Sequence, residues 1–170
     1  MIFVTIGSAF PFDRLIRAMD AWAETTGRGD ECLAQIGEGA YRPAHMDWRT
    51  SLTESDFAAT VKAARVVVSH AGMGSVITAM RHQTPIVLLP RRLAAGEHTT
   101  DHQMATARWL EDKPGVFIAQ GETELAARIA AADAWTGDGT ALPPFAPKEF
   151  TDRIATQIRA WTGSADQPAN

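Results

Sequence analysis

The segment SHAGMGS combines an imidazole, two glycines and a hydroxyl directly after a run of apolar, β-branched residues. His70 is followed there by Gly72, Gly74 and Ser75. Glycine allows a close backbone approach to a bulky anion, and the free N–H groups at a helix start favour a phosphate. Ile77 stands at the third glycine position of the dinucleotide fingerprint, and no Gly-Lys-Ser/Thr of a Walker loop follows. The segment therefore indicates either a phosphate site or a tight strand-to-helix turn without a ligand.

A second polar cluster, GEHTTDHQ, offers several side chains that could bind a ligand. His98 and His102 are four residues apart and suggest a metal site, but Thr99 after the first histidine breaks the HExxH pattern. Two alternatives remain: hydrogen bonds to a sugar or a phosphate, or a solvated helix start. Arg91 and Arg92, just before this cluster, are either surface charges or diphosphate partners, since guanidinium groups pair well with phosphate.

The segments that position these clusters alternate between short β-branched runs and amphipathic patterns. The runs predict strands at 2–6, 32–36, 65–69, 85–89 and 116–119, with 45–48 as a candidate short strand in the ambiguous stretch 38–52. Between them the patterns predict helices at 12–23, 53–61, 72–83, 100–111 and 122–133. This alternation predicts an α/β fold: one Rossmann-like domain whose parallel sheet has helices on both faces. Ligands in such sheets bind at the carboxyl ends of the strands, where both clusters fall.

The composition excludes several classes of protein. The chain has 170 residues and a net charge of −4, which argues against nucleic acid as the main partner. The single cysteine, Cys32, cannot form an internal disulfide, so we expect a reducing compartment. The first residues lack the basic region of a signal peptide, and no apolar run is long enough to span a membrane.

The end of the chain has a different composition. Residues 136–147 are rich in glycine and proline, and an amphipathic helix is expected at 150–161. This helix either docks onto a partner or packs back on the chain's own sheet. We expect one domain over residues 1–162 and a disordered tail at 163–170.

Taken together, the motifs resemble a known family. The pattern V-T-x-G…F-D-R-L-I, Q-I-G, S-H-A-G-M-G-S, P-R-R and G-E-H-x-x-D-H-Q-x-A-T-A over residues 1–133 is similar to the carboxy-terminal domain of family 28 glycosyltransferases. It is most similar to the short subunits of bacterial exopolysaccharide biosynthesis. The resemblance implies one half of a GT-B enzyme, an inverting hexosyltransferase whose donor is a nucleotide diphosphate sugar, usually a UDP-sugar, with no metal and no cofactor.

The resemblance also implies roles for individual residues. Expected catalytic groups are His70, Glu97 and His98. The diphosphate and nucleotide would be bound by Gly7, Ser8, Gln35, Gly37, Gly72, Met73, Gly74, Ser75, Thr78 and Arg91, and the donor sugar by Glu97, His98, Asp101, His102 and Gln103. One position departs from the family pattern. Many members place a glutamate on the ribose hydroxyls where this chain has Thr78, which can make only a weaker contact.

Partners follow from the same resemblance. The larger members carry an amino-terminal domain for the lipid acceptor, and the two-part members supply it as a separate, membrane-anchored subunit. The resemblance thus implies a cytoplasmic donor subunit, held at the inner face of the membrane by that partner and acting on a lipid-linked acceptor. Two other functions remain open: a nucleotide-sugar binding or regulatory module without transferase activity, and an epimerase or hydrolase of related fold.

Overall fold

A six-stranded parallel sheet forms the centre of the molecule. The computed structural model describes residues 1–39, 41–137 and 146–162. The strands are β1 (Ile2–Thr5), β2 (Cys32–Gln35), β3 (Asp47–Arg49), β4 (Val66–Ser69), β5 (Ile86–Leu88) and β6 (Val116–Ile118), in the spatial order β3-β2-β1-β4-β5-β6. The predicted α/β fold with a parallel sheet is confirmed.

The strand order reverses direction next to β1. The chain first builds outward through β2 and β3, and then returns to place β4 on the other side of β1. Thr5 at the end of β1 pairs in register with Ser69 at the end of β4. The loops that leave these two strands diverge toward opposite faces, and a crevice at such a switch point is the usual ligand site of an open α/β sheet.

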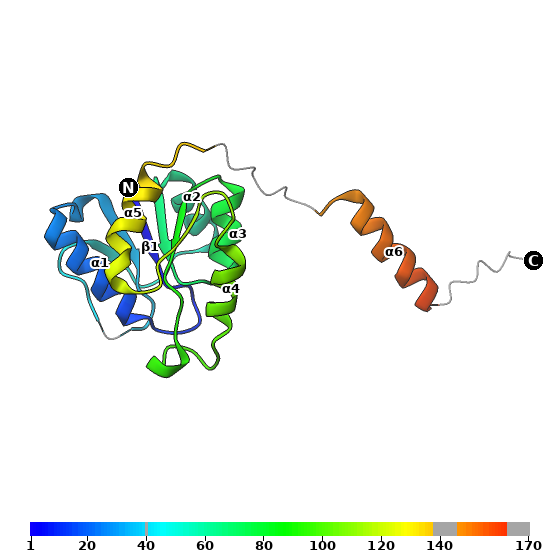
Figure 1. Ribbon diagram of the computed structural model, residues 1–170, viewed down its shortest axis with the longest axis horizontal. Helices are drawn as coiled ribbons and strands as arrows, with labels where there is room; N and C mark the ends of the chain where they lie inside the picture. Colours follow the sequence, from blue (N-terminus) through cyan, green and yellow to red (C-terminus); the bar gives the residue numbers. More distant parts are fainter. Residues whose placement is uncertain (40, 138–145, 163–170) are drawn as a thin grey trace, which may run out of the picture.

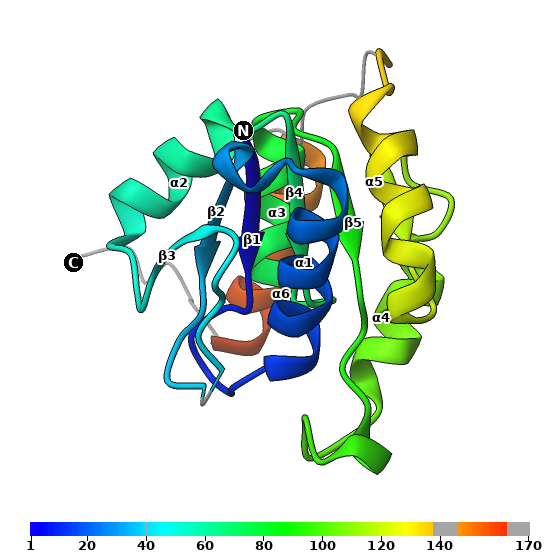
Figure 2. The same ribbon diagram turned by 90° about the vertical axis from the view of Figure 1, so that its left-hand side faces the viewer.

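Two layers of helices cover the sheet (Figure 1). Helices α1 (Asp13–Thr26) and α5 (Leu125–Asp133) pack on one face, and α2 (Glu54–Ala63), α3 (Met73–Arg81) and α4 (His102–Leu110) on the other. Single 3-10 turns lie at Gly29–Glu31, Leu93–Ala95 and Glu122–Glu124. Figure 2 shows β1 running from the N-terminus toward the end of the sheet where the loops before α1 and α4 lie.

Alternation along the strands explains why both faces are covered. In β1, Ile2 and Val4 join the core beneath α1 and α5, whereas Phe3 joins the core beneath α2, α3 and α4. All three side chains have no exposed surface. A parallel strand buried on both sides is therefore apolar at successive positions, which is the pattern in the sequence.

The observed elements differ from the predicted ones mainly at their ends. The short strand expected at 45–48 is β3, Asp47–Arg49, and the helix expected from residue 100 begins at His102. Residues 122–124 form a 3-10 turn rather than the first turn of α5. Thr53 caps α2 as expected, because its Oγ1 accepts a hydrogen bond from the Asp56 N–H at 3.1 Å.

Helix α6 (Lys148–Thr162) stands apart from the α/β unit (Figure 1). None of its residues is buried, so the structure gives no support to the alternative in which it packs on the sheet. The expected disordered tail at 163–170 lies outside the described residues, and the domain boundary at 162 stays a prediction. Within the described ranges, no helix is both long and apolar enough to cross a membrane.

Candidate functional site

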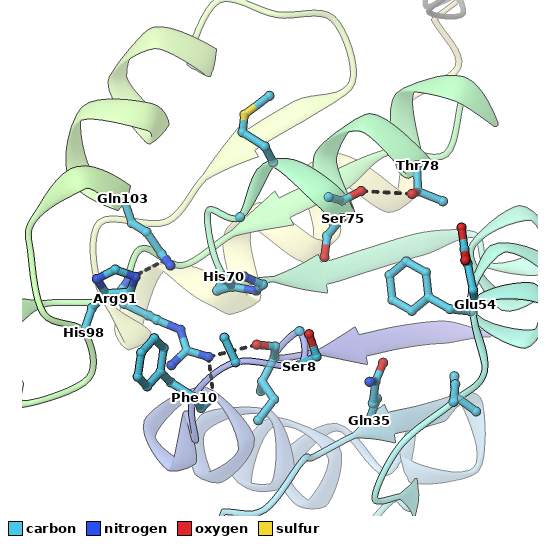
Figure 3. Close-up of a pocket in the computed structure, with 18 residues that line it drawn as sticks. Ser8, Phe10, Gln35, Glu54, His70, Ser75, Thr78, Arg91, His98 and Gln103 are labelled. Carbon is cyan, nitrogen blue, oxygen red and sulfur yellow. Dashed lines mark hydrogen bonds between the residues drawn. The ribbon is translucent and has the colours of Figure 1, made fainter. Parts of the chain in front are cut away.

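A pocket of about 590 Å³ opens at the carboxyl ends of β1 and β4, the switch point of the sheet (Figure 3). Its walls come from the loop after β1, the start of α2, the loop between β4 and α3, and the loop between β5 and α4. The lining residues are Ile6, Gly7, Ser8, Ala9, Phe10, Gln35, Leu52, Glu54, Phe57, His70, Gly72, Met73, Gly74, Ser75, Thr78, Arg91, His98 and Gln103.

Close packing between two loops explains the first glycine. Gly7 has φ +72°, a conformation that side chains rarely adopt, and a Cβ there would lie 2.7 Å from Cε1 of His70. Its N–H donates to Oγ1 of Thr5 at 3.2 Å, which turns the chain sharply at the end of β1. Ser8, the next residue, is exposed at the pocket mouth.

His70 lies between two glycines at the bottom of the pocket. A Cβ on Gly72 would overlap the imidazole around Nε2, so that nitrogen lies on the glycine side of the ring. The other ring nitrogen, Nδ1, lies 3.2 Å from Oγ of Ser69. Burial lowers the pKa of His70 to about 4, and the charges of Arg91 and His98 act in the same direction. The ring is therefore neutral at physiological pH.

The start of α3 leaves its N–H groups free for a ligand. Its N-cap is Gly72, no side chain caps it, and its first turn contains no acid. By contrast, Thr53 caps α2. Met73 and Gly74 are exposed here, and a Cβ on Gly74 would meet nothing within 4 Å. An uncapped helix N-terminus that faces a pocket is suited to bind an anion.

Arg91 lines the pocket as predicted, but its guanidinium group is bound within the protein. Its side chain is only 2 % exposed, and burial lowers its pKa to about 10. Nη1 donates to the carbonyls of Pro11 and Glu97 at 2.8 and 3.1 Å. Nη2 donates to those of Ile6 and Phe10 at 2.8 and 2.6 Å. All four terminal N–H groups of Arg91 donate to carbonyls of the protein. Arg91 therefore holds the loops together and has no terminal N–H group left for a phosphate.

Gln103 joins two of the lining loops. Its Oε1 accepts from the backbone N–H groups of Ala71 and Arg91 at 3.2 and 3.1 Å. These two hydrogen bonds fix the orientation of the side-chain amide. Its nitrogen, Nε2, has no hydrogen-bond partner among the described residues and is available as a donor at the pocket wall.

Three residues predicted to face the donor sugar do not line the pocket. Glu97 is paired with Arg14, whose Nε and Nη2 lie 2.6 and 2.8 Å from its two carboxylate oxygens. Asp101 accepts from the N–H of Leu93 at 2.9 Å, and His102 is exposed at the start of α4. Both carboxylate oxygens of Glu97 are thus engaged by Arg14, and its predicted catalytic role stays a prediction.

His98 does line the pocket. Its ring packs edge-on against Phe10, with centroids 5.4 Å apart. Its Nδ1 accepts from the N–H of Thr100 at 3.2 Å, which leaves Nε2 as the donor. The predicted Gly37 lines an adjoining hollow that shares Ser8 and Gln35 with the main pocket. Among the described residues, no three His, Cys, Asp or Glu side chains come together as a metal site.

One wall of the pocket was not among the predicted site residues. Its members Leu52, Glu54 and Phe57 follow the short third strand, which the sequence offered only as a candidate at 45–48 within the ambiguous stretch 38–52. The available signal was positional. Once β3 is counted as a parallel strand, the residues after it also lie at the carboxyl edge of the sheet.

Comparison with known proteins adds a family. The model of the glycosyltransferase family 28 C-terminal domain matches residues 1–129. No curated protein matches the chain.

Solved structures share the fold at low sequence identity. The calicheamicin glycosyltransferase CalG4 is 15% identical with a TM-score of 0.61, over 95% of this chain and 43% of that one. MurG of Acinetobacter baumannii is 16% identical with a TM-score of 0.52, over 92% and 40%. ALG13 is 16% identical with a TM-score of 0.54, over 90% and 93%. The chain thus spans about two fifths of CalG4 and MurG, but nearly all of the ALG13 structure.

Proposed function

The chain belongs to the family of glycosyltransferase family 28 C-terminal domains, and we propose that it is the donor-binding subunit of an inverting glycosyltransferase. The donor is a nucleotide diphosphate sugar, in the first instance a UDP-sugar. The observation that carries this proposal is the uncapped N-terminus of α3, which faces a pocket at the switch point of a parallel sheet.

The diphosphate is bound at the start of α3. The N–H groups of Met73, Gly74 and Ser75 and the helix dipole favour a dianion there. Hydrogen bonds to charged partners contribute about 1.5–3 kcal/mol each, so three of them supply several kcal/mol toward binding before the costs of association. Gly7 and Ser8 approach the same phosphates from the loop after β1.

The chain's part in the reaction is to stabilise the leaving group. As the bond from the anomeric carbon to the diphosphate breaks, negative charge grows on the phosphate oxygens. Fixed N–H donors stabilise that charge without reorganisation. The neutral ring of His70 lies beside Gly72 and can add one N–H donor. His98, from the loop before α4, and Gln103, from the start of α4, hold the sugar through Nε2 donors.

The acceptor side lies on a second component. We propose a membrane-anchored partner that binds a lipid-linked acceptor in exopolysaccharide or glycan synthesis and holds this subunit at the cytoplasmic face. The large exposed apolar residues of α6 support such a contact, since Phe150, Ile154, Ile158 and Trp161 share one side of the helix. The general base that accepts the acceptor proton is then a group of the partner.

A second function, a nucleotide-sugar binding module without transfer activity, is favoured by one observation. Glu97 is tied to Arg14, so the carboxylate expected near the sugar is not free to act as a base. A binding module needs the pocket but not the base.

One experiment separates the two functions. The chain is assayed with a radiolabelled UDP-sugar and a lipid-linked acceptor, alone and after co-expression with the protein of the neighbouring reading frame. We expect donor binding in both preparations and rapid transfer only with the partner, since positioning of the reactants lowers the barrier by about 7–11 kcal/mol. Donor binding without transfer in any combination would favour the binding module.

A further inference from the structure

We propose that Glu54 binds the ribose of the donor nucleotide and makes the site selective for ribonucleotides. This inference rests on the proposed function, because it assigns the nucleoside end of the same pocket. It concerns a residue for which the sequence suggested only a place in a helix start.

Glu54 is the first residue of α2 and lies on the pocket wall opposite His98 and Gln103 in Figure 3. The phosphate-binding turn of α3 occupies the middle of the pocket. One turn further along α3, Thr78 also lines the wall, and Figure 3 shows Glu54 on the Thr78 side of the pocket. A group attached to a phosphate at Gly74 therefore extends either toward His98 or toward Glu54.

The carboxylate of Glu54 is free to accept a ligand. It is exposed, and it makes no hydrogen bond or ion pair with any residue that the structure describes. The acids of the β5–α4 loop, by contrast, are occupied: Glu97 by Arg14 and Asp101 by the Leu93 N–H. The hydroxyl of Thr78 donates to the carbonyl of Gly74 at 2.9 Å, so it can serve a ligand only as an acceptor.

The chemistry of a carboxylate selects the ribose. An ionised carboxylate only accepts hydrogen bonds, and its two oxygens match the two O–H donors of a cis-diol. The same charge repels a phosphate, so Glu54 cannot serve the diphosphate itself. Phe57, half-buried beside it, gives this end of the pocket an apolar wall against which a sugar ring or base can pack. The pocket thus offers donors for the phosphates at α3 and acceptors for the diol at α2.

The position of Glu54 in the helix also has a structural explanation that the test must separate. An acid in the first turn stabilises a helix through its dipole, whether or not a ligand is present. Asp56 lies in the same turn, but does not line the pocket. Removal of either acid weakens the dipole interaction, and removal of Asp56 also breaks the hydrogen bond that its carboxylate accepts from the Thr53 hydroxyl at 2.7 Å, but only removal of Glu54 changes the ligand site. Asp56→Ala is therefore the matched control, with circular dichroism to verify that both variants fold.

The test measures the affinities of UDP and 2′-deoxyuridine 5′-diphosphate by calorimetry. We expect the native chain to prefer UDP by about tenfold, the size of one hydrogen bond to a charged acceptor. Glu54→Ala should reduce this preference to within about twofold, whereas Asp56→Ala should retain it.

Three results would overturn the inference. The native chain could bind both nucleotides equally, or Glu54→Ala could keep the full preference for UDP. Glu54→Ala could also change the preference among UDP, CDP and GDP while the ribose preference stays intact, which would assign the carboxylate to the base. If the native chain binds UDP in any of these cases, the proposed function stands and only the role of Glu54 fails. If no nucleoside diphosphate binds at all, both fail.

Discussion

Arg91 shows how a single residue can have the predicted location and a different task. A guanidinium after a strand at the ligand edge of the sheet predicts a phosphate contact. The structure instead directs it inward, where it binds carbonyls from residues 6–11 and from Glu97. Sequence spacing cannot show this, because three of the four carbonyls come from a loop 80 to 85 residues away that has no side-chain signal of its own. Arg91 therefore stabilises the loops that line the pocket.

Replacement of Arg91 with methionine should destabilise the protein and loosen the loop after β1. The variant keeps the aliphatic packing but removes the donor of four carbonyls, of which that of Ile6 is buried. We expect the free energy of unfolding to fall by roughly 3 kcal/mol, as measured in urea. Arg91→Lys should restore only part of the loss, because one ammonium cannot reach both pairs of carbonyls. Full stability of the methionine variant would show that the four bonds contribute nothing net.

His70 should stay neutral across the physiological pH range. Burial holds its folded-state pKa at about 4, below the ordinary value of 6.5. Between these two pH values the unfolded chain binds more protons at His70 than the folded chain does. The contribution of His70 to the free energy of unfolding is therefore fully present above pH 6.5 and is lost as the pH drops toward 4. The imidazole resonances of His70 in an NMR titration report its pKa directly. A midpoint near 6.5 would contradict the buried, neutral ring.

Elements were predictable where one physical signal dominated. The buried strands β1, β4 and β5 have uninterrupted apolar runs, and their alternation with amphipathic helices determined the fold class. The glycines at the ends of β1 and β4 located the pocket. The short strand β3 has only a half-buried Trp48 between exposed neighbours, so no hydrophobic period supported it and the sequence offered it only as a candidate at 45–48. The wall that follows β3, including Glu54, was missed for that reason.

Asp20 fixes the segment that leads into β3. On α1, it is 2 % exposed and accepts from the hydroxyl of Tyr41 at 2.6 Å and from the N–H groups of Ala44 and His45 at 3.1 and 2.7 Å. Burial acts to raise its pKa, but these hydrogen bonds outweigh that effect and hold the pKa below 3.8.

Asp20→Asn should therefore lower the free energy of unfolding by about 2 kcal/mol at neutral pH, because an amide nitrogen replaces one acceptor. The native contribution is complete above pH 3.8 and is lost as the pH falls through the lower folded-state pKa, so the two proteins should converge in acid. Urea titrations at a series of pH values measure the difference. If the two proteins differed by the same free energy of unfolding at all pH values, protonation of Asp20 would not be coupled to folding.

At the scale of the whole molecule, the reversal of strand order at β1 brings the two glycine loops to one crevice. Helix α6 extends the chain beyond this unit with an apolar face that none of its own contacts buries. The sequence predicted both the unit and the amphipathic helix. The sequence could not show whether this helix docks onto a partner or packs on the chain's own sheet. Periodicity shows which face of a helix is apolar but not what covers that face.

Activity of the complete transferase should not depend on a bound metal. In the proposed function, the leaving group is stabilised by the backbone N–H groups of α3 and the neutral imidazole of His70. Prior dialysis against EDTA should leave the transfer rate unchanged within about twofold. Loss of activity that zinc or magnesium restores would reassign His98 and His102 as ligands.

The central claim is that a diphosphate is bound at the start of α3, and the variant Gly74→Val tests it most directly. A Cβ at this position meets nothing within 4 Å in the protein, so the fold should be kept while the branched side chain occupies the space of the phosphate. Calorimetric titration with a UDP-sugar should show an affinity at least tenfold weaker than that of the native chain, about 1.4 kcal/mol. An unchanged affinity in a folded variant would mean that this loop is a turn and not the diphosphate site.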